Sequence, residues 1–329
     1  MSPCYYKWTV VLIHFRLQNQ TEWKATRSTI AVERAMELHH NLTYGRLSQA
    51  TINRVEKFVF FVGYGRSGHS IIASMMDAHP NIIIAHEFYL FDKWATKVPS
   101  VRKKSSLFND LYRNSYDSAL QGWRTPQKVQ KGYTLELGGA WQGRFDQLKV
   151  IGDKTAGDTA MKCHHSPEKF KEMYQGLQDT VGIPIRVLHV VRNPYDMIAT
   201  VVLYNASDKH EVKVEASQEH KFNSSVLLRN AVANVFAKAD GVVKMINSCH
   251  LNILEIHIED LIEDPKKVIQ RICYFLELEC SKEYLQKCHD KTFKTLSRSR
   301  DLVMWTPSLL ARVQREKEKY PFFERYSFN

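Results

Sequence analysis

The turn GYGRSG at residues 63–68 has the glycine spacing of a phosphate-binding loop and follows an apolar run. Successive backbone N–H groups of such a turn, with the N-terminus of the next helix, bind anions. A nucleoside-triphosphate loop continues with Lys and then Ser or Thr. This chain has His69 and Ser70 there, and its cation stands earlier, at Arg66. The turn therefore predicts an anion site without the triphosphate-binding lysine. An ordinary glycine-containing turn is the alternative.

A second candidate anion site centres on Arg192, which follows the apolar run IRVLHVV at 185–191. A guanidinium at the end of a strand offers a fixed fork for a phosphate group. The helix expected next adds its dipole and carries the hydroxyl of Thr200, eight residues after Arg192. Taken alone, Arg192 also fits a structural ion pair with Asp196.

Two further residues suit transfer chemistry. Glu87 lies just past the apolar run at 82–85 and is the best candidate for a general base. His86 is its rival, because an imidazole with an ordinary pKa near ~6.5 suits the same role. Lys154 follows the run LKVIG at 148–152 and offers a cation. A capping or ion-paired Glu87, and a salt bridge of Lys154 with Asp153 or another neighbour, remain open.

These residues need a scaffold, and the apolar pattern predicts one. Strands are expected at 57–63, 82–85, 148–152, 185–191 and 253–258, and helices at 70–78, from 166–167 onward, at 194–204, 223–247 and 265–276. Residues 88–147 indicate helices with long loops. Alternating strands and helices predict a three-layer α/β sandwich with a mainly parallel sheet. Ligands bind at the carboxyl ends of such strands, where segments 63–70, 152–155 and 192–200 fall.

The domain is expected to span 51–329, after an N-terminal segment, 1–50, of uncertain structure. Lys plus Arg exceed Asp plus Glu by 11, which favours anionic partners. Zinc-finger spacing and RNA-binding signatures are absent from the sequence, so nucleic acid is not predicted. The run WTVVLIHF at 8–15 is far shorter than the ~20 apolar residues of a membrane span, and we expect a strand or the remnant of a signal segment.

Residues Gly65-Arg66-Ser67-Gly68 resemble the 5′-phosphosulfate loop of sulfotransferases that use 3′-phosphoadenosine 5′-phosphosulfate (PAPS). The resemblance is closest to the Golgi carbohydrate and tyrosylprotein sulfotransferases, whose "LDAHP" matches MDAHP at 76–80. Arg192 and Thr200 have the spacing of the family's 3′-phosphate motif, with Thr in place of Ser. The stretch 257–288 resembles the family's "YEDL…DP…FL" segment. The similarity covers about 57–290, with His69 departing from the usual threonine.

The resemblance implies a P-loop-like sulfotransferase fold and transfer of a sulfuryl group from PAPS to a hydroxyl, leaving 3′,5′-bisphosphorylated adenosine (PAP). In that interpretation Glu87 is the base, Arg66 steadies the leaving oxygen and Lys154 contacts the sulfonate. Gly65, Arg66, Ser67, Gly68, His69, Ser70, Arg192 and Thr200 bind the donor, and Arg300 closes over the nucleotide from a basic loop that also fits a solvated face. No metal is required, because these cations and the loop N–H groups neutralise the phosphates.

The acceptor is expected to be a glycan or protein tyrosine. One alternative function is a P-loop nucleotide kinase or NTPase, which the missing lysine and the lack of an evident magnesium carboxylate disfavour. Another is an inactive sulfotransferase-fold binding protein, which His69 favours.

Compartment signals are mixed. Sequons stand at Asn19, Asn41, Asn205 and Asn223. Six cysteines are too few to define a disulfide scaffold, although Cys280 and Cys288 are close enough in sequence to pair in an oxidising compartment. With the resemblance, the sequons favour the Golgi lumen or secretory pathway; reduced thiols and a cytoplasmic location remain open.

Overall fold

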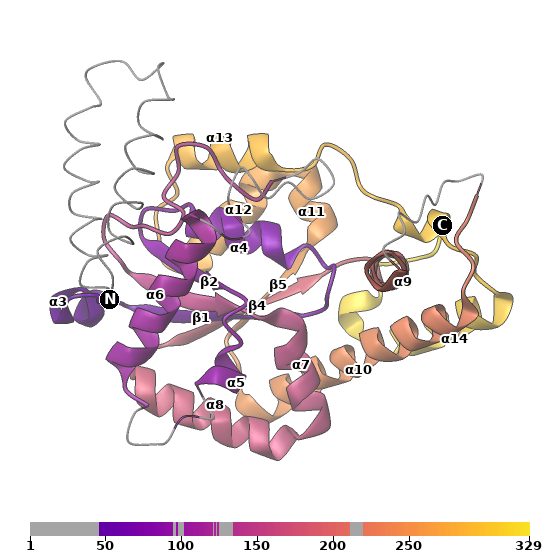
Figure 1. The fold of residues 1–329 in the computed structure, drawn as a ribbon, viewed down its shortest axis with the longest axis horizontal. Coiled ribbons are helices and arrows are strands. Elements are labelled where there is room, and N and C mark those ends of the chain that lie inside the picture. The colour runs from indigo at the N-terminus through magenta and orange to yellow at the C-terminus, as the bar shows by residue number, and fades with distance from the viewer. Residues whose placement is uncertain are drawn as a thin grey trace. The chain divides into compact units, whose positions relative to one another are not determined.

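A parallel five-stranded sheet lies at the centre of the structure, with the strand order β2-β3-β1-β4-β5 (Figure 1). The computed structural model describes residues 46–94, 97, 102–120, 122, 124, 134–210 and 220–329. The strands are β1 (Lys57–Gly63), β2 (Ile82–His86), β3 (Val150–Lys154), β4 (Ile185–Val191) and β5 (Ile253–His257). All four neighbouring pairs are parallel, which confirms the predicted α/β class.

Helices cover both faces of the sheet and make the predicted three layers (Figure 1). One face packs against α4 (His69–Asp77), α11 (Ile258–Glu263), α12 (Pro265–Phe275) and α13 (Lys282–Lys291). The other packs mainly against α6 (Lys104–Leu120), α7 (Ala156–His165), α8 (Pro167–Val181) and α10 (Ser225–Cys249). Along β1, Val59 and Phe61 face the first layer while Phe58 and Phe60 face the second. This alternation buries all seven β1 residues.

The remaining elements complete the second layer and the C-terminal region. They are α3 (Gln49–Arg54), α5 (Leu90–Lys93), α9 (Pro194–His210), the short 3₁₀ helix η3 (Ser299–Leu302), α14 (Pro307–Lys317) and η4 (Pro321–Phe323). Residues 88–147 contain α5 and α6, as their composition predicted.

Most elements lie where the apolar runs predicted them, but β3 begins and ends two residues later than expected. Its pairing with β1 runs from Lys57 opposite Val150 to Phe60 opposite Asp153. Asp153 and Lys154 therefore belong to the strand rather than to the turn after it. Both side chains are buried, and hydrogen bonds with the Phe88 amide and the Glu87 carboxylate compensate for their loss of contact with water.

Asp77 joins α4 to its surroundings and gives the MDAHP stretch a structural role. Its carboxylate accepts hydrogen bonds from the Ile84 amide (2.6 Å), the Gly143 amide (2.8 Å) and the Ser115 hydroxyl (2.7 Å), and it pairs with the buried Arg124. Each oxygen of the buried carboxylate is thus compensated. The end of α4 is thus fixed to the middle of β2.

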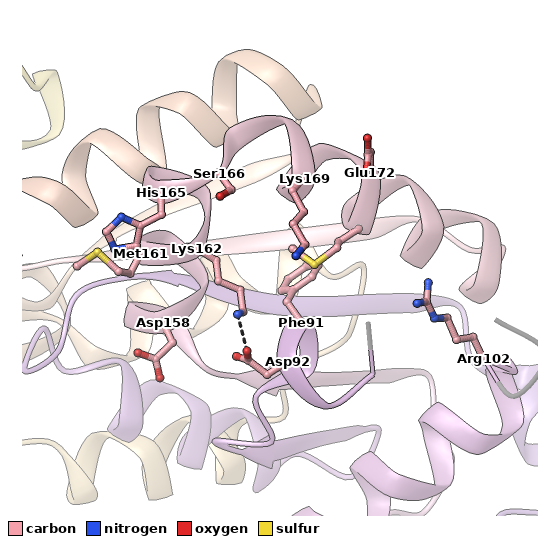
Figure 2. Close-up of a pocket in the computed structure, with 11 residues that line it drawn as sticks. Phe91, Asp92, Arg102, Asp158, Met161, Lys162, His165, Ser166, Lys169 and Glu172 are labelled. Atoms are coloured by element: carbon pink, nitrogen blue, oxygen red, sulfur yellow. Dashed lines mark ion pairs between the residues drawn. The ribbon is translucent and has the colours of Figure 1, made fainter. Parts of the chain in front are cut away.

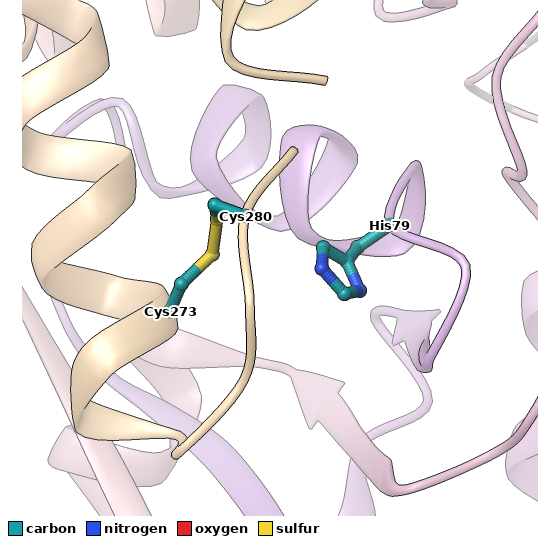
Figure 3. Close-up of side chains that lie close together, drawn as sticks. All are labelled: His79, Cys273 and Cys280. Atoms are coloured by element: carbon teal, nitrogen blue, oxygen red, sulfur yellow. A yellow bond between two sulfur atoms is a disulfide. The ribbon is translucent and has the colours of Figure 1, made fainter. Parts of the chain in front are cut away.

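The disulfide of this region joins Cys273 to Cys280, so the proposed pairing of Cys280 with Cys288 is wrong (Figure 3). After Cys273 the chain reverses: the Leu278 amide donates to the Cys273 carbonyl, which returns Cys280 to a Cα–Cα distance of 6.1 Å. Cys288 lies on α13 and is a buried free thiol. Close spacing along the chain did not place it beside Cys280, because α13 points it into the core.

His79 lies beside this disulfide, but both of its ring nitrogens are engaged (Figure 3). Nε2 bonds the Glu279 carbonyl at 2.9 Å, and Nδ1 accepts from the Asn81 amide at 3.1 Å. The imidazole therefore ties α4 to the segment before α13.

Among the described ranges, no helix has the length and apolar character needed to cross a membrane. The expected strand at 8–15 and the sequons at Asn19 and Asn41 lie outside the described residues.

Candidate functional site

The turn between β1 and α4 has the geometry of an anion-binding loop. Gly68 takes φ +91° at the N-cap of α4, and a Cβ atom there would lie 2.5 Å from the Ile258 side chain. Glycine is thus required by both backbone and space. The first N–H groups of α4 have no partner within the helix and point toward the carboxyl end of the sheet. Arg66 has φ +68°, a conformation that non-glycine residues rarely adopt.

Two predicted loop residues shape the turn from inside. Ser67 is fully buried; its hydroxyl donates to the Tyr64 carbonyl at 3.0 Å and lies 3.1 Å from His69 Nδ1. His69 is also buried. Ser70 is half-buried, and within the described residues its hydroxyl makes no hydrogen bond. Ser70 is therefore the loop hydroxyl that is free to meet a ligand.

The pKa of His69 is affected by several positively charged side chains around the loop. Burial is the main cause that holds the pKa of its imidazole well below the ordinary value. The charges of Lys154, Arg66 and Lys238 act in the same direction. Lys154 of β3, Arg66 of the turn and Lys238 of α10 thus bring positive charge near one imidazole, which favours an anion at the loop.

Glu87 and Lys154 form an ion pair beside the loop, with 2.8 Å between Oε1 and Nζ. The Lys154 side chain is completely buried, whereas that of Glu87 is 42% exposed. Burial lowers the pKa of Lys154, and the Glu87 carboxylate opposes that change. Glu87 is thus ion-paired and Lys154 forms a salt bridge with a neighbour, as the alternative interpretations of both residues predicted. That neighbour is not Asp153, which binds the Phe88 and Leu90 amides and the Thr155 hydroxyl.

The backbone at Glu87 is strained. Glu87 has φ +51° and Tyr89 has φ +58°, two left-handed residues within three positions. Such conformations cost of order 1–3 kcal/mol each and cluster at functional sites. The Asp153 carboxylate and the Thr155 hydroxyl hold this turn through the amides of Phe88 and Tyr89. The contacts fix the Glu87 carboxylate in an exposed position at the carboxyl end of β2.

His86, the rival base, has a different environment. Its side chain is buried, and burial, with the charge of Lys154, lowers the pKa of its imidazole. An imidazole that resists protonation in this way is a poor proton acceptor. His86 is therefore the weaker candidate for the base, whereas the Glu87 side chain is 42% exposed.

Arg66 does not point toward Glu87. Its guanidinium stacks on the exposed ring of Tyr204, 3.8 Å from the ring centroid. Tyr204 lies one turn beyond Thr200 on α9, so the two share a helix face. The cation proposed for the leaving oxygen therefore lies against α9.

Arg192 links the loop to the C-terminal region. Its guanidinium donates to the Arg66 carbonyl and to the Ser297 carbonyl, each at 3.0 Å. Within the described residues it is not in an ion pair with Asp196, so that alternative is wrong: Asp196 pairs with Arg300 instead, at 2.7 Å. Arg192 thus stays half-buried at the carboxyl end of β4, with its charge not neutralised by a paired carboxylate.

Thr200 and Arg300, two of the predicted donor-binding residues, both form hydrogen bonds with Asp196. The Thr200 hydroxyl donates to the Asp196 carbonyl at 2.7 Å. Arg300 is buried and bonds Asp196 through both its backbone amide and its guanidinium, so it is not part of a solvated face. Their contacts with nucleotide stay predictions.

A cavity of about 860 Å³ lies between α5, α7 and α8 (Figure 2). It is lined by Phe91, Asp92, Arg102, Asp158, Met161, Lys162, His165, Ser166, Lys169, Glu172 and Met173. Lys162 pairs with Asp92 across it (Figure 2). Tyr89 precedes α5: burial raises the pKa of its phenol, and the carboxylates of Glu87, Asp158 and Asp92 add to the rise.

Sequence reasoning missed Lys238, Tyr204 and Tyr89. Tyr204 and Lys238 lie on α9 and α10, far in sequence from the loop. One signal was present for Lys238: it interrupts the buried apolar positions Val235, Ala239 and Val242 of α10.

A phosphate-type loop, two cations and an exposed carboxylate at one sheet edge define an anion-binding α/β transferase site. The family model described as "Sulfotransferase domain" matches residues 56–328. The chain therefore belongs to the sulfotransferase family, and this confirms the resemblance. The Golgi subtype is not resolved by that match.

Solved structures of sulfotransferases are similar at low identity. The sulfotransferase domain from the curacin biosynthetic pathway is 16% identical, with a TM-score of 0.49, covering 84% of this chain and 100% of its own. The corresponding domain of the Synechococcus olefin synthase is 15% identical, TM-score 0.47, covering 81% and 94%. A mouse sulfotransferase complexed with PAP is 13% identical, TM-score 0.43, covering 82% and 87%. No curated protein shows significant sequence similarity to the chain.

Proposed function

We propose that this sulfotransferase moves a sulfuryl group from PAPS to a hydroxyl carried by a glycan or a protein tyrosine. The observation that carries the proposal is the Glu87–Lys154 pair beside a phosphate loop that lacks the triphosphate lysine, with Arg192 at the end of the next strand. A kinase or NTPase loop would hold Lys where this chain has His69.

The chemistry follows from these positions. Glu87 accepts the acceptor's proton as the hydroxyl oxygen attacks sulfur. The bond from sulfur to the bridging phosphate oxygen breaks, and PAP leaves with that oxygen. Lys154 meets charge on the transferring sulfonate, and Arg66 moves from Tyr204 to the leaving oxygen. Cations and loop N–H groups supply the charge stabilisation, so the proposed reaction needs no metal ion.

The cavity between α5, α7 and α8 suits a polar acceptor. Six of its lining side chains carry charge in equal numbers of each sign, and Phe91, Met161 and Met173 supply apolar surface. A sugar or peptide, with polar groups along its length, is complementary to such a wall, whereas a wholly apolar steroid leaves the charges unpaired.

The nucleotide preference tests the proposed function. PAP should raise the melting temperature of the purified chain, with about 2.7 kcal/mol of stabilisation at 100 times its Kd. ATP with magnesium should raise it far less, because the loop lacks the lysine for a triphosphate. Adenosine 5′-monophosphate is the matched control for the 3′-phosphate. A larger shift with ATP than with PAP would replace the sulfotransferase activity with a kinase activity.

We also propose the secretory pathway as the compartment, supported by the Cys273–Cys280 disulfide and an exposed sequon at Asn223. Peptide mapping of protein from a secretory host should find this disulfide, a free Cys288 thiol and a glycan on Asn223. Asn205 is the internal control, because it is half-buried on α9 and should remain unmodified. Free thiols at both Cys273 and Cys280, with Asn223 unmodified, contradict this location.

A further inference from the structure

Lys238 extends from the middle of α10 toward the phosphate loop. A Cβ atom at Gly157 would lie 3.4 Å from Lys238 Nζ and 3.4 Å from the Gly65 amide nitrogen. Gly157 thus lies against both the ammonium and the loop backbone, and a methyl group at this position would contact each of them. Glycine at position 157, in the first turn of α7, leaves this space open.

The ammonium lacks a close counter-ion. Its Nζ donates to Asn234 Oδ1 at 2.8 Å, and within the described residues no carboxylate lies within 4.0 Å of it. Asp158 acts on it at longer range, and burial lowers the pKa of Lys238. A partly buried charge without a paired carboxylate is costly to a fold unless a ligand compensates it. Two N–H donors remain to bind an anion.

Close helix packing fixes this position. A Cβ atom at Gly241 would lie 2.0 Å from the Ala160 carbonyl oxygen, so α10 and α7 approach more closely than any side chain would allow. Gly241 follows Lys238 by three residues, and Ala160 follows Gly157 by three. Since residues three apart share a helix face, this contact sets Lys238 beside Gly157.

We propose that Lys238 binds the sulfonate of the PAPS donor, as a third cation beside Lys154 and Arg66. This inference rests on the proposed function. Arg192 contacts the Arg66 carbonyl from the α9 side of the loop, where the 3′-phosphate is expected. Lys238 approaches from the α7 side, next to Asp158, which lines the cavity proposed for the acceptor. It therefore lies at the end of the donor that the acceptor attacks, where negative charge spreads over the transferring group.

The test compares two ligands that differ by the sulfonate. Titration without acceptor should show that Lys238→Met binds PAP within about twofold of the unsubstituted protein, while its PAPS affinity falls about 10–100-fold, as for one charge-assisted contact. The unliganded variant should melt no lower than the unsubstituted protein, because methionine replaces an uncompensated charge with similar volume. Lys244→Met is the matched control on α10; its ammonium pairs with Asp240, and both affinities should stay unchanged.

Each other outcome overturns the assignment. If Lys238→Met weakened the affinities for PAP and PAPS equally, Lys238 would bind the 5′-phosphate, which both ligands carry. Unchanged PAPS affinity with a raised KM for the acceptor would make it an acceptor contact. A fall in melting temperature without ligand would make it structural. Failure of the unsubstituted protein to bind PAP would instead refute the proposed function, and it is detected before any variant is compared.

Discussion

Glu87→Gln is expected to lower turnover about 10²–10⁴-fold while leaving PAP affinity nearly unchanged. The amide keeps the shape of the side chain and an oxygen that can accept from Lys154 Nζ, which lies 2.8 Å from Glu87 Oε1. It cannot take a proton from the acceptor hydroxyl. Single-turnover rates with saturating PAPS, measured beside PAP titrations, separate the chemical step from donor binding.

Two controls make the assignment of the base specific. Glu87→Asp keeps the charge but withdraws the carboxylate by one methylene, so it should retain more turnover than Glu87→Gln. His86→Asn should leave the turnover of folded protein within a few-fold, because the imidazole is buried and its pKa is lowered. If His86→Asn abolishes turnover and Glu87→Gln does not, His86 is the base and Glu87 is not.

The apolar runs predicted the framework because parallel strands are buried on both faces. Residues 57–63 and 185–191 lie in β1 and β4 with the predicted ends. The glycine turn was recognisable because position 68 needs φ +91°, a backbone conformation that glycine adopts without strain. Local requirements of this kind are written into a few neighbouring residues.

Features that depend on distant packing were not predictable. The contact of Arg66 with Tyr204 requires the position of α9 relative to the loop. Lys238 meets the loop because α10 packs against α7 at Gly241. The predicted pairing of Cys280 with Cys288 was wrong for a related reason. A turn after Cys273 brings Cys280 close to Cys273, whereas Cys288 on α13 lies in the core. In each case sequence separation gave no measure of distance in space.

The ion pair at Asp196 shows how the correct residue can be assigned the wrong partner. Arg192 and Arg300 were both available to its carboxylate, and the fold uses Arg300. That choice leaves Arg192 bonded to two backbone carbonyls, which do not cancel its charge. A guanidinium held by neutral acceptors at the end of β4 is poised to bind a phosphate.

Arg192→Ala should therefore weaken PAP binding by about 2–4 kcal/mol, since a charge-assisted contact to the 3′-phosphate is lost in a half-buried site. The loss should be much smaller for adenosine 5′-phosphosulfate, which lacks that phosphate. Thr200→Val should cost less, because it removes one neutral hydroxyl that already bonds the Asp196 carbonyl.

Arg298→Ala is the matched control in this prediction. Its guanidinium belongs to the residue after Ser297, which Arg192 contacts, but it is exposed and pairs with Asp301, so its removal should change PAP affinity little. Arg192→Lys separates charge from geometry, because an ammonium cannot reach both the Arg66 and Ser297 carbonyls as the planar fork does. Isothermal titration of each folded variant with PAP gives the comparison. An unchanged affinity in Arg192→Ala would place the 3′-phosphate elsewhere, and a loss equal for both nucleotides would mean that Arg192 supports the loop rather than binding that phosphate.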